Sequence, residues 1–359
     1  MKNQKIIIAT GGTGGHIYPA ITLAKALQDK GHDVSFIGNK DKMEATLIPQ
    51  HGFAFYSIVN RGLVGNPIQK VMAIVAQIKP MFNSKKILKQ LHADKVVVFG
   101  GYVSIPVGFA AVLSKIPLIL HEQNAIPGLA NKILAPFAKA IAVSYPHSVS
   151  DFKHKNVQFT GNPRGSLMPP ETDREAFFNA YKLSSEKKTV LFVMGSQGSE
   201  TVNKVLKQYA TSSKEMNYQI ILVTGKNHYK DFISTVSSND QLAIVDHIAQ
   251  TEALHYVDAI VCRGGATTVS EVIGANIPAL FIPSPYVVKN HQYENIKPLL
   301  QKDAAMMIKE QELTVELLKE KIDVLLSEKT SSTCKENMRI FATENACKDV
   351  LQLVINKYE

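Results

Sequence analysis

The chain has 359 residues, more than a single hydrophobic core usually serves, so its length predicts two domains of ordinary size. Hydrophobic residues make up 45% and charged residues 20% of the chain, which excludes a disordered or fibrous protein. The net charge of +9 suits an anionic partner such as nucleic acid, lipid head groups or a phosphorylated substrate, and does not choose among them.

The start of the chain and its cysteines indicate the compartment. A predicted strand begins at Lys5 with no apolar signal segment before it, and no apolar stretch approaches the ~20 residues of a membrane span. Cys262, Cys334 and Cys347 are an odd number without a C-x-x-C pair, which argues against a disulfide framework and a structural zinc site. We therefore expect a protein that stays in the cytoplasm with reduced cysteines.

The first half of the chain alternates short apolar runs with amphipathic stretches, which is the pattern of βαβ units. Helices are predicted through Leu23 and Leu27 and around residues 43–50. The apolar runs are continuous rather than alternating, as in strands that are buried on both faces. They lie at residues 5–10, 33–38, 53–59, 95–100, 117–122 and 140–144. This half is predicted to be a parallel, doubly wound sheet.

The same pattern restarts after Asn162 to Glu171, a segment rich in proline and polar residues. Strands are predicted at residues 188–195, 219–225, 242–246, 259–264 and 278–283. The predicted fold class is α/β, with two Rossmann-like doubly wound parallel-sheet domains that face each other across a cleft. The predicted domains span residues 1–162 and 163–335, and the helical stretch 336–359 is expected to pack back on the first domain.

Glycine-rich turns follow three of the predicted strands, at residues 11–16, 100–102 and 195–199. Glycines at a helix start let backbone N–H groups approach phosphate oxygens, and the helix dipole favours the anion there. The first turn is no dinucleotide fingerprint, because Ile17 stands where the third glycine belongs, and no P-loop pattern occurs. Each turn alone could also be a tight turn without a ligand.

A fourth turn, residues 262–271, follows a strand and opens a helix with Gly264 and Gly265 at its start. Glu271 lies one to two turns into that helix, where a carboxylate could accept hydrogen bonds from ribose hydroxyls. A glutamate in a first turn is more often only a partner of the helix dipole. Further on, Asn290 to Gln292 could bind sugar hydroxyls or could be ordinary polar loop residues.

Together these motifs resemble those of the MurG family of glycosyltransferases. GGTGGHIYPA, GGYVS, HEQNAIPGLANK, TGNPRG, GSQGS, CRGGATTVSE and NHQYEN match in order and at similar spacing over nearly the whole chain. The resemblance implies the two-domain GT-B fold and an inverting transfer of N-acetylglucosamine (GlcNAc) from UDP-GlcNAc to lipid I, undecaprenyl-diphospho-MurNAc-pentapeptide, which gives lipid II. It also implies a peripheral enzyme at the cytoplasmic face of the cell membrane, with partners among cell-wall synthesis or division proteins.

The resemblance also assigns binding residues. For donor and acceptor they are Thr13, Gly14, Gly15, Tyr102, Asn124, Arg164, Ser196, Gln197, Ile248, Gly265, Ala266, Thr267, Glu271 and Gln292. Residues 13–15 would face the donor or acceptor diphosphate, and Ser196 with residues 264–267 the UDP phosphates. Glu271 would hold the ribose and Gln292 the GlcNAc hydroxyls.

Further roles carry over with small departures from the family pattern. Asn124 would lie near the transferred sugar, and a main-chain group at His247 or Ile248 would contact uracil. Arg164 follows its proline directly, whereas some family members have the arginine one residue later. His291-Gln292 stands where some members have two glutamines.

An inverting transfer needs a base for the acceptor hydroxyl. His16 follows the first glycine turn at a helix start and titrates near neutrality, so it is the leading base, and Glu122 is the reserve. The positive end of the helix would depress the pKa of His16 and favour the neutral form. His16 could instead bind phosphate or pack under the turn. No metal or other cofactor is expected, because no D-x-D motif or histidine cluster occurs.

A basic, apolar stretch is a candidate membrane contact. Residues 61–95 hold seven basic residues and one acid, Asp94. In the helix predicted after Pro67, the stripe expected to face the core is Ile68, Val71, Val75 and Ile78, and the surplus apolar residues are Ile74, Met81 and Phe82. The surplus residues, beside Lys79, Lys85 and Lys86, suit an anionic membrane surface. Two buried faces of one helix would give the same pattern.

Rival functions remain open from the sequence. The nearest rival is another UDP-sugar enzyme of the same fold, such as a UDP-GlcNAc 2-epimerase or a diacylglycerol glucosyltransferase, and HEQN together with GGTGGH favours the MurG family over it. A cell-wall or lipid-binding scaffold without turnover would not need His16, Glu271 and Gln292 together. No nucleic-acid partner is expected, because the basic stretch is interleaved with aliphatic rather than stacking aromatic residues.

Overall fold

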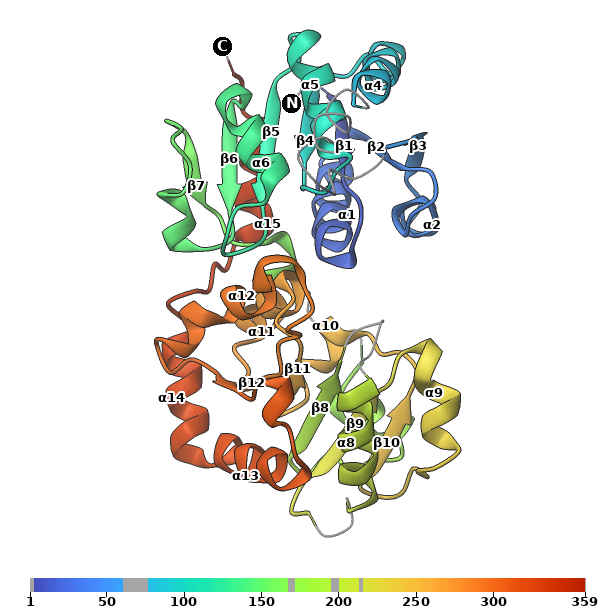
Figure 1. Ribbon diagram of the computed structural model, residues 1–359, viewed down its shortest axis with the longest axis vertical. Coiled ribbons are helices and arrows are strands. Elements are labelled where there is room, and N and C mark those ends of the chain that lie inside the picture. The colour runs from blue at the N-terminus through green and yellow to red at the C-terminus, as the bar shows by residue number, and fades with distance from the viewer. Residues whose placement is uncertain (1–2, 61–76, 167–171, 195–199, 213–215, 359) are drawn as a thin grey trace. The chain divides into compact units, whose positions relative to one another are not determined.

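Figure 1 shows the computed structural model, which describes residues 3–60, 77–166, 172–194, 200–212 and 216–358. The chain folds into two compact units. The first contains Met1–Ser166 and Thr343–Glu359, and the second contains Leu167–Ala342.

Within the described residues, the first unit is built on a sheet of seven parallel strands in the order β3-β2-β1-β4-β5-β6-β7. The strands are β1 (Lys5–Ala9), β2 (Asp33–Asn39), β3 (Ala54–Ile58), β4 (Lys95–Val98), β5 (Leu118–Glu122), β6 (Ala140–Val143) and β7 (Val157–Phe159). The chain moves outward from β1 to β3 and then returns to place β4 beside β1. Ligands of such sheets bind outside the carboxyl ends of the strands at this switch point.

Helices cover both faces of this sheet. They are α1 (Gly14–Asp29), α2 (Glu44–Gln50), α4 (Ile78–Gln90), α5 (Ser104–Leu113), α6 (Leu129–Leu134) and α15 (Ala346–Ile355), with 3₁₀ turns η1 (Ala135–Phe137), η2 (Pro146–Val149) and η3 (Pro163–Gly165). Because successive strand residues point to opposite faces, Ile6 and Ile8 pack with residues of α1 and α15, while Ile7 packs with residues of α4, α5 and α6. The continuous apolar runs follow from this two-sided burial.

The last helix, α15, belongs to the first unit and packs against α1, as Figure 1 also shows. Its carboxyl end is held by Lys95 at the start of β4, whose Nζ donates hydrogen bonds of 2.5 Å to the carbonyl oxygens of Val354 and Asn356. Burial lowers the pKa of Lys95, which is 4% exposed. A lysine at the last carbonyls stabilises a helix end. Lys95 therefore does not belong to a membrane-facing surface, which corrects its inclusion in the basic stretch.

Within the described residues, the second unit has six parallel strands in the order β10-β9-β8-β11-β12-β13. They are β8 (Thr189–Val193), β9 (Gln219–Val223), β10 (Leu242–Val245), β11 (Ala259–Cys262), β12 (Ala279–Phe281) and β13 (Met306–Met307). The helices are α7 (Arg174–Ala180), α8 (Glu200–Thr211), α9 (Lys226–Ile233), α10 (Gln250–Ala253), α11 (Ala266–Ala275), α12 (His291–Leu300), α13 (Val315–Leu326) and α14 (Glu328–Met338), with 3₁₀ turns η5 (Val288–Asn290) and η6 (Glu310–Glu312). Here β8 and β11 flank the switch point.

The structure confirms the predicted pair of Rossmann-like sheets and every strand predicted from an apolar run. Two edge strands, β7 and β13, were not predicted. They have three and two residues, and each is only partly buried, so neither has the continuous apolar run of the inner strands. None of the helices in the described parts of the chain is long and apolar enough to cross a membrane.

Candidate active site

The first glycine turn connects β1 to α1 at the switch point of the first unit. Thr13 is the N-cap residue of α1, with extended backbone angles (φ −141°, ψ 158°). Its side chain caps no backbone N–H of the helix. Instead, Thr13 Oγ1 lies 3.3 Å from Nδ1 of His16, the third residue of the helix. The predicted base thus stands at a helix N-terminus, beside a hydroxyl group.

The second glycine turn, after β4, lies against the first. Gly100 and Gly101 both have positive φ angles, of 85° and 81°. A Cβ atom on Gly101 would lie 2.5 Å from the carbonyl oxygen of Gly11, and a Cβ on Gly100 would lie 3.1 Å from Cδ2 and 3.2 Å from Nε2 of His16. Both positions therefore favour glycine, and the His16 ring has Nδ1 near Thr13 of the first turn and Cδ2 and Nε2 near Gly100 of the second.

A buried carboxylate that the sequence analysis missed supports the first turn. Glu44 is 1% exposed, and its side chain accepts the N–H of Gly12 and the N–H of Asn39, each at 3.1 Å. The Gly12 N–H is therefore engaged within the protein, so a diphosphate at this turn must be bound by other groups. The only sequence signal was an acid in the first turn of a short helix, which is common.

The loop after β5 is organised by Glu122, which is 1% exposed. Its Oε1 accepts the backbone N–H (3.0 Å) and the side-chain amide (3.1 Å) of Asn124, and its Oε2 accepts the N–H of Gly128 (2.9 Å) and the amide of Asn131 (2.8 Å). Burial raises the pKa of Glu122, and these four donors act in the opposite direction. A carboxylate held on both oxygens in the interior suits a structural anchor, and the assignment of Glu122 as the reserve base stays a prediction.

The neighbours of Glu122 tie this loop to the rest of the carboxyl edge. Gln123 is 1% exposed and donates from Nε2 to the carbonyl oxygen of Phe99 at 2.9 Å, next to the second glycine turn. His121 is fully buried, with Nε2 3.2 Å from the carbonyl oxygen of Gly161, and burial lowers its pKa to about 4. Asn124 is partly exposed and is oriented by Glu122.

Two further predicted residues of the first unit lie at the same edge. Arg164 lies in η3, with its guanidinium carbon 5.8 Å from the ring centre of Tyr18 in α1. Tyr102 is 46% exposed, and its carbonyl oxygen accepts a 2.8 Å hydrogen bond from the side chain of Asn60, which follows β3. The structure therefore places His16, Tyr102 and Asn124 after the neighbouring strands β1, β4 and β5, and Arg164 after β7 at the edge of the same sheet.

In the second unit, the turn after β11 leads directly into α11. A Cβ on Gly264 would lie 2.2 Å from the carbonyl oxygen of Gln292, so close packing of α12 requires this glycine. Gly265 is different, because its backbone angles are ordinary (φ −69°, ψ 138°) and a Cβ there would meet no atom of the described residues within 4 Å. Within the described part of the chain, neither packing nor backbone strain explains this glycine, and the space beside it lies at the N-terminus of α11, where Ala266 and Thr267 begin the helix.

Side chains from three strand ends gather around this turn. Glu271 of α11 is 3% exposed, and its Oε2 accepts a 2.5 Å hydrogen bond from Nε2 of Gln250, which follows β10. Gln292 at the start of α12 accepts the N–H of Ser284, which follows β12, at 2.8 Å. The side chain of Ile248 is buried, so a contact with a base at this position falls to the main chain. Gln250 was missed because nothing local marks a glutamine in a four-residue helix.

Two predicted residues, Ser196 and Gln197, lie outside the described residues. The same holds for most of the predicted membrane-facing helix, including Ile68, Val71, Ile74 and Val75. Within the described ranges, no cluster of three or more histidine, cysteine, aspartate or glutamate side chains could hold a metal ion.

The described part of the basic stretch is α4. Its buried residues Pro80, Ser84 and Leu88 face the core, and Met81 also packs against the core. Ile78 and Phe82 are 49% and 58% exposed. This reverses two expectations, since Ile78 was placed in the core stripe and Met81 among the surplus residues. The stripe expected from the sequence does not match the buried face of α4, which begins at Ile78 and buries Pro80, Ser84 and Leu88.

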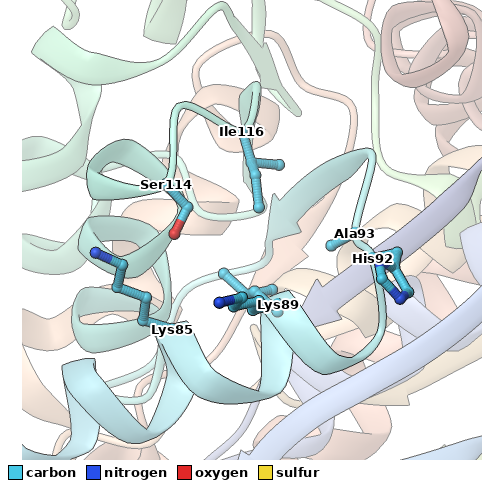
Figure 2. A pocket seen from close by; sticks show the side chains of 7 residues that line it. Lys85, Lys89, His92, Ala93, Ser114 and Ile116 are labelled. Atoms are coloured by element: carbon cyan, nitrogen blue, oxygen red, sulfur yellow. The ribbon is translucent and has the colours of Figure 1, made fainter.

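Basic side chains continue along α4. A hollow of about 350 Å³ between α4 and the end of α5 is lined by Lys85, Leu88, Lys89, His92, Ala93, Ser114 and Ile116. Figure 2 shows the side chains that line it. His92 precedes β4 and Ile116 precedes β5, so this hollow lies at the amino ends of the strands. It is separate from the edge that holds His16.

Comparisons with known proteins agree with this geometry. The glycosyltransferase family 28 N-terminal domain matches residues 6–143, and the glycosyltransferase family 28 C-terminal domain matches residues 189–354. The chain is 36% identical over 352 residues to a Bacillus subtilis (strain 168) protein named UDP-N-acetylglucosamine--N-acetylmuramyl-(pentapeptide) pyrophosphoryl-undecaprenol N-acetylglucosamine transferase, with 96% of each chain covered.

Solved structures of glycosyltransferases also match the chain over nearly its whole length. The crystal structure of Acinetobacter baumannii MurG matches with a TM-score of 0.77 and 29% identity, covering 98% of this chain and 99% of that one. The calicheamicin glycosyltransferase CalG4 matches with a TM-score of 0.72 at 13% identity, over 99% of this chain and 98% of that one, which shows a common fold alone. The predicted GT-B fold class and the resemblance to the MurG family are thereby confirmed. The chain belongs to glycosyltransferase family 28, among the UDP-N-acetylglucosamine--N-acetylmuramyl-(pentapeptide) pyrophosphoryl-undecaprenol N-acetylglucosamine transferases.

Proposed function

We propose that this chain transfers GlcNAc from UDP-GlcNAc to the MurNAc 4-hydroxyl of lipid I and so forms lipid II. The observation that carries the proposal is the 36% identity to the B. subtilis transferase, because it extends over 96% of both chains and so includes both switch-point edges. The substrates are those named for that relative. The polar groups that gather at the two edges suit a sugar nucleotide and a diphosphate-linked acceptor.

For the donor, we place UDP-GlcNAc at the turn after β11. The space beside Gly265 would admit a phosphate close to the N–H groups that begin α11, where the helix dipole favours negative charge. Glu271, oriented by Gln250, would accept hydrogen bonds from the ribose hydroxyls. Because Gln292 Oε1 is engaged by Ser284, its contact with the sugar would come from the N–H groups of the amide.

For the chemistry, His16 acts as the general base. Its imidazole takes the proton of the acceptor hydroxyl while that oxygen attacks the anomeric carbon from the face opposite UDP. The bond to UDP breaks with its electron pair on the departing phosphate, so the anomeric configuration inverts. The N-terminus of α11 stabilises the charge that develops on UDP. Glu122 contributes by fixing Asn124 rather than by proton transfer.

For the acceptor, we propose a peripheral contact between α4 and the anionic cytoplasmic face of the membrane. Ile78 and Phe82 are one turn apart on the same face of the helix, and Lys85, Lys86 and Lys89 follow as exposed residues. Apolar groups at one end of a face and cations at the other suit insertion among anionic head groups. Cell-wall synthesis or division proteins remain proposed partners on the family resemblance alone.

The direct test is transfer of labelled GlcNAc from UDP-GlcNAc to a lipid I analogue, with UDP-glucose as competitor. We expect the labelled disaccharide-linked lipid and no inhibition by UDP-glucose at equal concentration. The His16→Ala variant, expressed and purified in the same way, controls for contaminating transferases. Release of free or epimerised sugar without labelled lipid would instead indicate an epimerase or hydrolase of the same fold and overturn the proposal.

A further inference from the structure

Two threonines of this chain occupy the same position of two helices and behave differently. Thr13 is the N-cap of α1 and Thr314 the N-cap of α13, and both have extended backbone angles (φ −141°, ψ 158° and φ −125°, ψ 167°). Thr314 Oγ1 accepts the N–H of Leu317, the third residue of its helix, at 3.1 Å. This is the usual role of an N-cap hydroxyl. Thr13 has no such bond.

The hydroxyl of Thr13 is paired with a ring instead. Leu317 in α13 and His16 in α1 are both the third helical residue, so Thr13 is placed to cap the backbone N–H of His16. The backbone N–H of His16 instead donates a 3.0 Å hydrogen bond to the carbonyl oxygen of Thr13. Thr13 Oγ1 lies 3.3 Å from His16 Nδ1. The helix therefore forgoes a side-chain cap and gains a contact with the imidazole. An N-cap bond typically stabilises a helix, so its absence has a cost that function can explain.

The position of the other ring nitrogen shows what this contact can do. His16 Nε2 lies on the side of the second glycine turn, 3.2 Å from where a Cβ of Gly100 would be. A neutral imidazole carries its proton on one nitrogen and accepts on the other. If Nδ1–H donates to Thr13, the lone pair is on Nε2, which is the form that a base using Nε2 requires. The hydrogen bond on one nitrogen thus sets the role of the other.

We infer that Thr13 is a positioning residue for the reaction: its Oγ1 accepts a hydrogen bond from His16 Nδ1–H and holds the imidazole with Nε2 unprotonated. This inference rests on the proposed function only in naming His16 as the base. During transfer, Nε2 takes the acceptor proton, and the resulting imidazolium keeps its Nδ1–H bond to Thr13. The diphosphate contact that the family resemblance implies for Thr13 is the competing role.

The first test needs no substrate. The ¹⁵N chemical shifts of the His16 ring, read above its pKa, report which nitrogen carries the proton. We expect a protonated Nδ1 in the wild type and in Thr13→Ser, which keeps the hydroxyl, and a shift of population toward the Nε2–H tautomer in Thr13→Val, which removes it. Unchanged shifts in Thr13→Val would overturn the inference, whether or not the chain is a transferase.

The second test is kinetic. Thr13→Val should lower kcat by roughly 3- to 10-fold, as expected for loss of one neutral hydrogen bond, with little change in KM for either substrate, and Thr13→Ser should retain most of the rate. In a His16→Ala background, Thr13→Val should have no further effect on kcat. Two outcomes would show that the Thr13 hydroxyl binds diphosphate. One is that Thr13→Val lowers kcat equally in the wild-type and His16→Ala backgrounds, and the other is that it raises the acceptor KM and leaves kcat intact.

Thr314→Val is the matched control for folding. It should lower the thermal midpoint without changing kcat, because Thr314 caps α13 away from both switch points, whereas Thr13→Val should leave the midpoint nearly unchanged. If Thr13→Val lowers the midpoint as much as Thr314→Val does, Thr13 is an ordinary cap and the inference fails. The two proposals can also fail separately. If the wild type forms no labelled lipid, but the ¹⁵N shifts of His16 respond to the Thr13 substitutions as expected, only the proposed function is overturned.

Discussion

Gln250 and Glu271 are 21 residues apart in the chain and are joined by a 2.5 Å hydrogen bond from Nε2 to Oε2. Gln250 begins α10, which follows β10, and Glu271 lies in α11, which follows β11, so the bond links segments whose strands are separated by β9 and β8 in the sheet. It holds the carboxylate of Glu271 in one orientation in a site that is nearly closed to solvent, with 3% of the residue exposed.

Removing this carboxylate is expected to weaken donor binding. Glu271→Ala should raise the dissociation constant of UDP by about tenfold or more, because a hydrogen bond to a charged group contributes ~1.5–3 kcal/mol. Isothermal calorimetry with UDP measures this directly. Glu316→Ala, at an exposed glutamate of α13, is the matched control and should bind UDP as the wild type does. Unchanged affinity in Glu271→Ala would remove the ribose assignment.

His16→Ala should lower kcat by about 10²- to 10⁴-fold, the usual contribution of a general base, while the UDP dissociation constant changes little. Single-turnover transfer and calorimetry together separate the two effects. His255→Ala, at an exposed histidine of the second unit, controls for loss of a histidine elsewhere. A fall of only a few fold, together with weaker ligand binding, would assign His16 to phosphate binding instead.

Glu122→Gln distinguishes an anchor from a base. In the wild type, both carboxylate oxygens of Glu122 accept hydrogen bonds from N–H donors. In Glu122→Gln an NH₂ group replaces one of these oxygens and faces N–H donors that it cannot accept from. We therefore expect the free energy of unfolding to fall by about 1–3 kcal/mol. Urea titration followed by circular dichroism measures the change. If the variant is as stable as the wild type and has nevertheless lost turnover, Glu122 acts in the chemistry and not as an anchor.

The double variant Ile78→Ser, Phe82→Ser should bind vesicles containing anionic phospholipid at least tenfold more weakly, because each fully buried side chain of this type contributes ~1.5–3 kcal/mol. Flotation assays measure binding, and turnover on a short-chain soluble acceptor should be retained. Ile233→Ser, at a residue of the second unit that is 46% exposed, should bind vesicles normally. Equal vesicle binding by the double variant would exclude this face of α4 as the membrane contact.

His121 predicts a pH dependence of stability. Its pKa is lowered from 6.5 to about 4 by burial, so below pH 6.5 the unfolded chain takes up a proton that the folded chain does not. The stabilisation is complete above pH 6.5 and is lost as the pH falls toward 4, by at most about 3 kcal/mol. Urea unfolding at pH 7 and pH 4.5 tests this.

In His121→Gln, whose amide can still donate to Gly161, the fall in stability between these pH values should be smaller. It should not vanish, because burial also lowers the pKa of His32 and His51. A fall as large as that of the wild type would mean that His121 is protonated in the folded state.

The sequence by itself determined the inner strands of the two sheets and the glycine turns that follow them, whereas the strand order came from the structure. Runs such as residues 5–10 and 95–100 are continuously apolar because both faces of an inner parallel strand are buried, and this signal is local. The glycines at residues 100 and 101 are equally local, because positive φ angles at a tight turn favour glycine. His16 could be selected because it directly follows such a turn.

The tertiary structure decided which polar side chains form pairs. Glu44 supports Gly12, Gln250 orients Glu271, and Lys95 holds the end of α15, from positions 32, 21 and 259 residues away. Burial and four hydrogen-bond donors fix the carboxylate of Glu122, although its sequence position also suits a base. The orientation of the Thr13 hydroxyl depends on a side-chain rotamer, and a threonine at an N-cap has the same sequence pattern whether it caps the backbone or holds a ring. Such choices are made by packing and by partners distant in the chain, and no local pattern carries them.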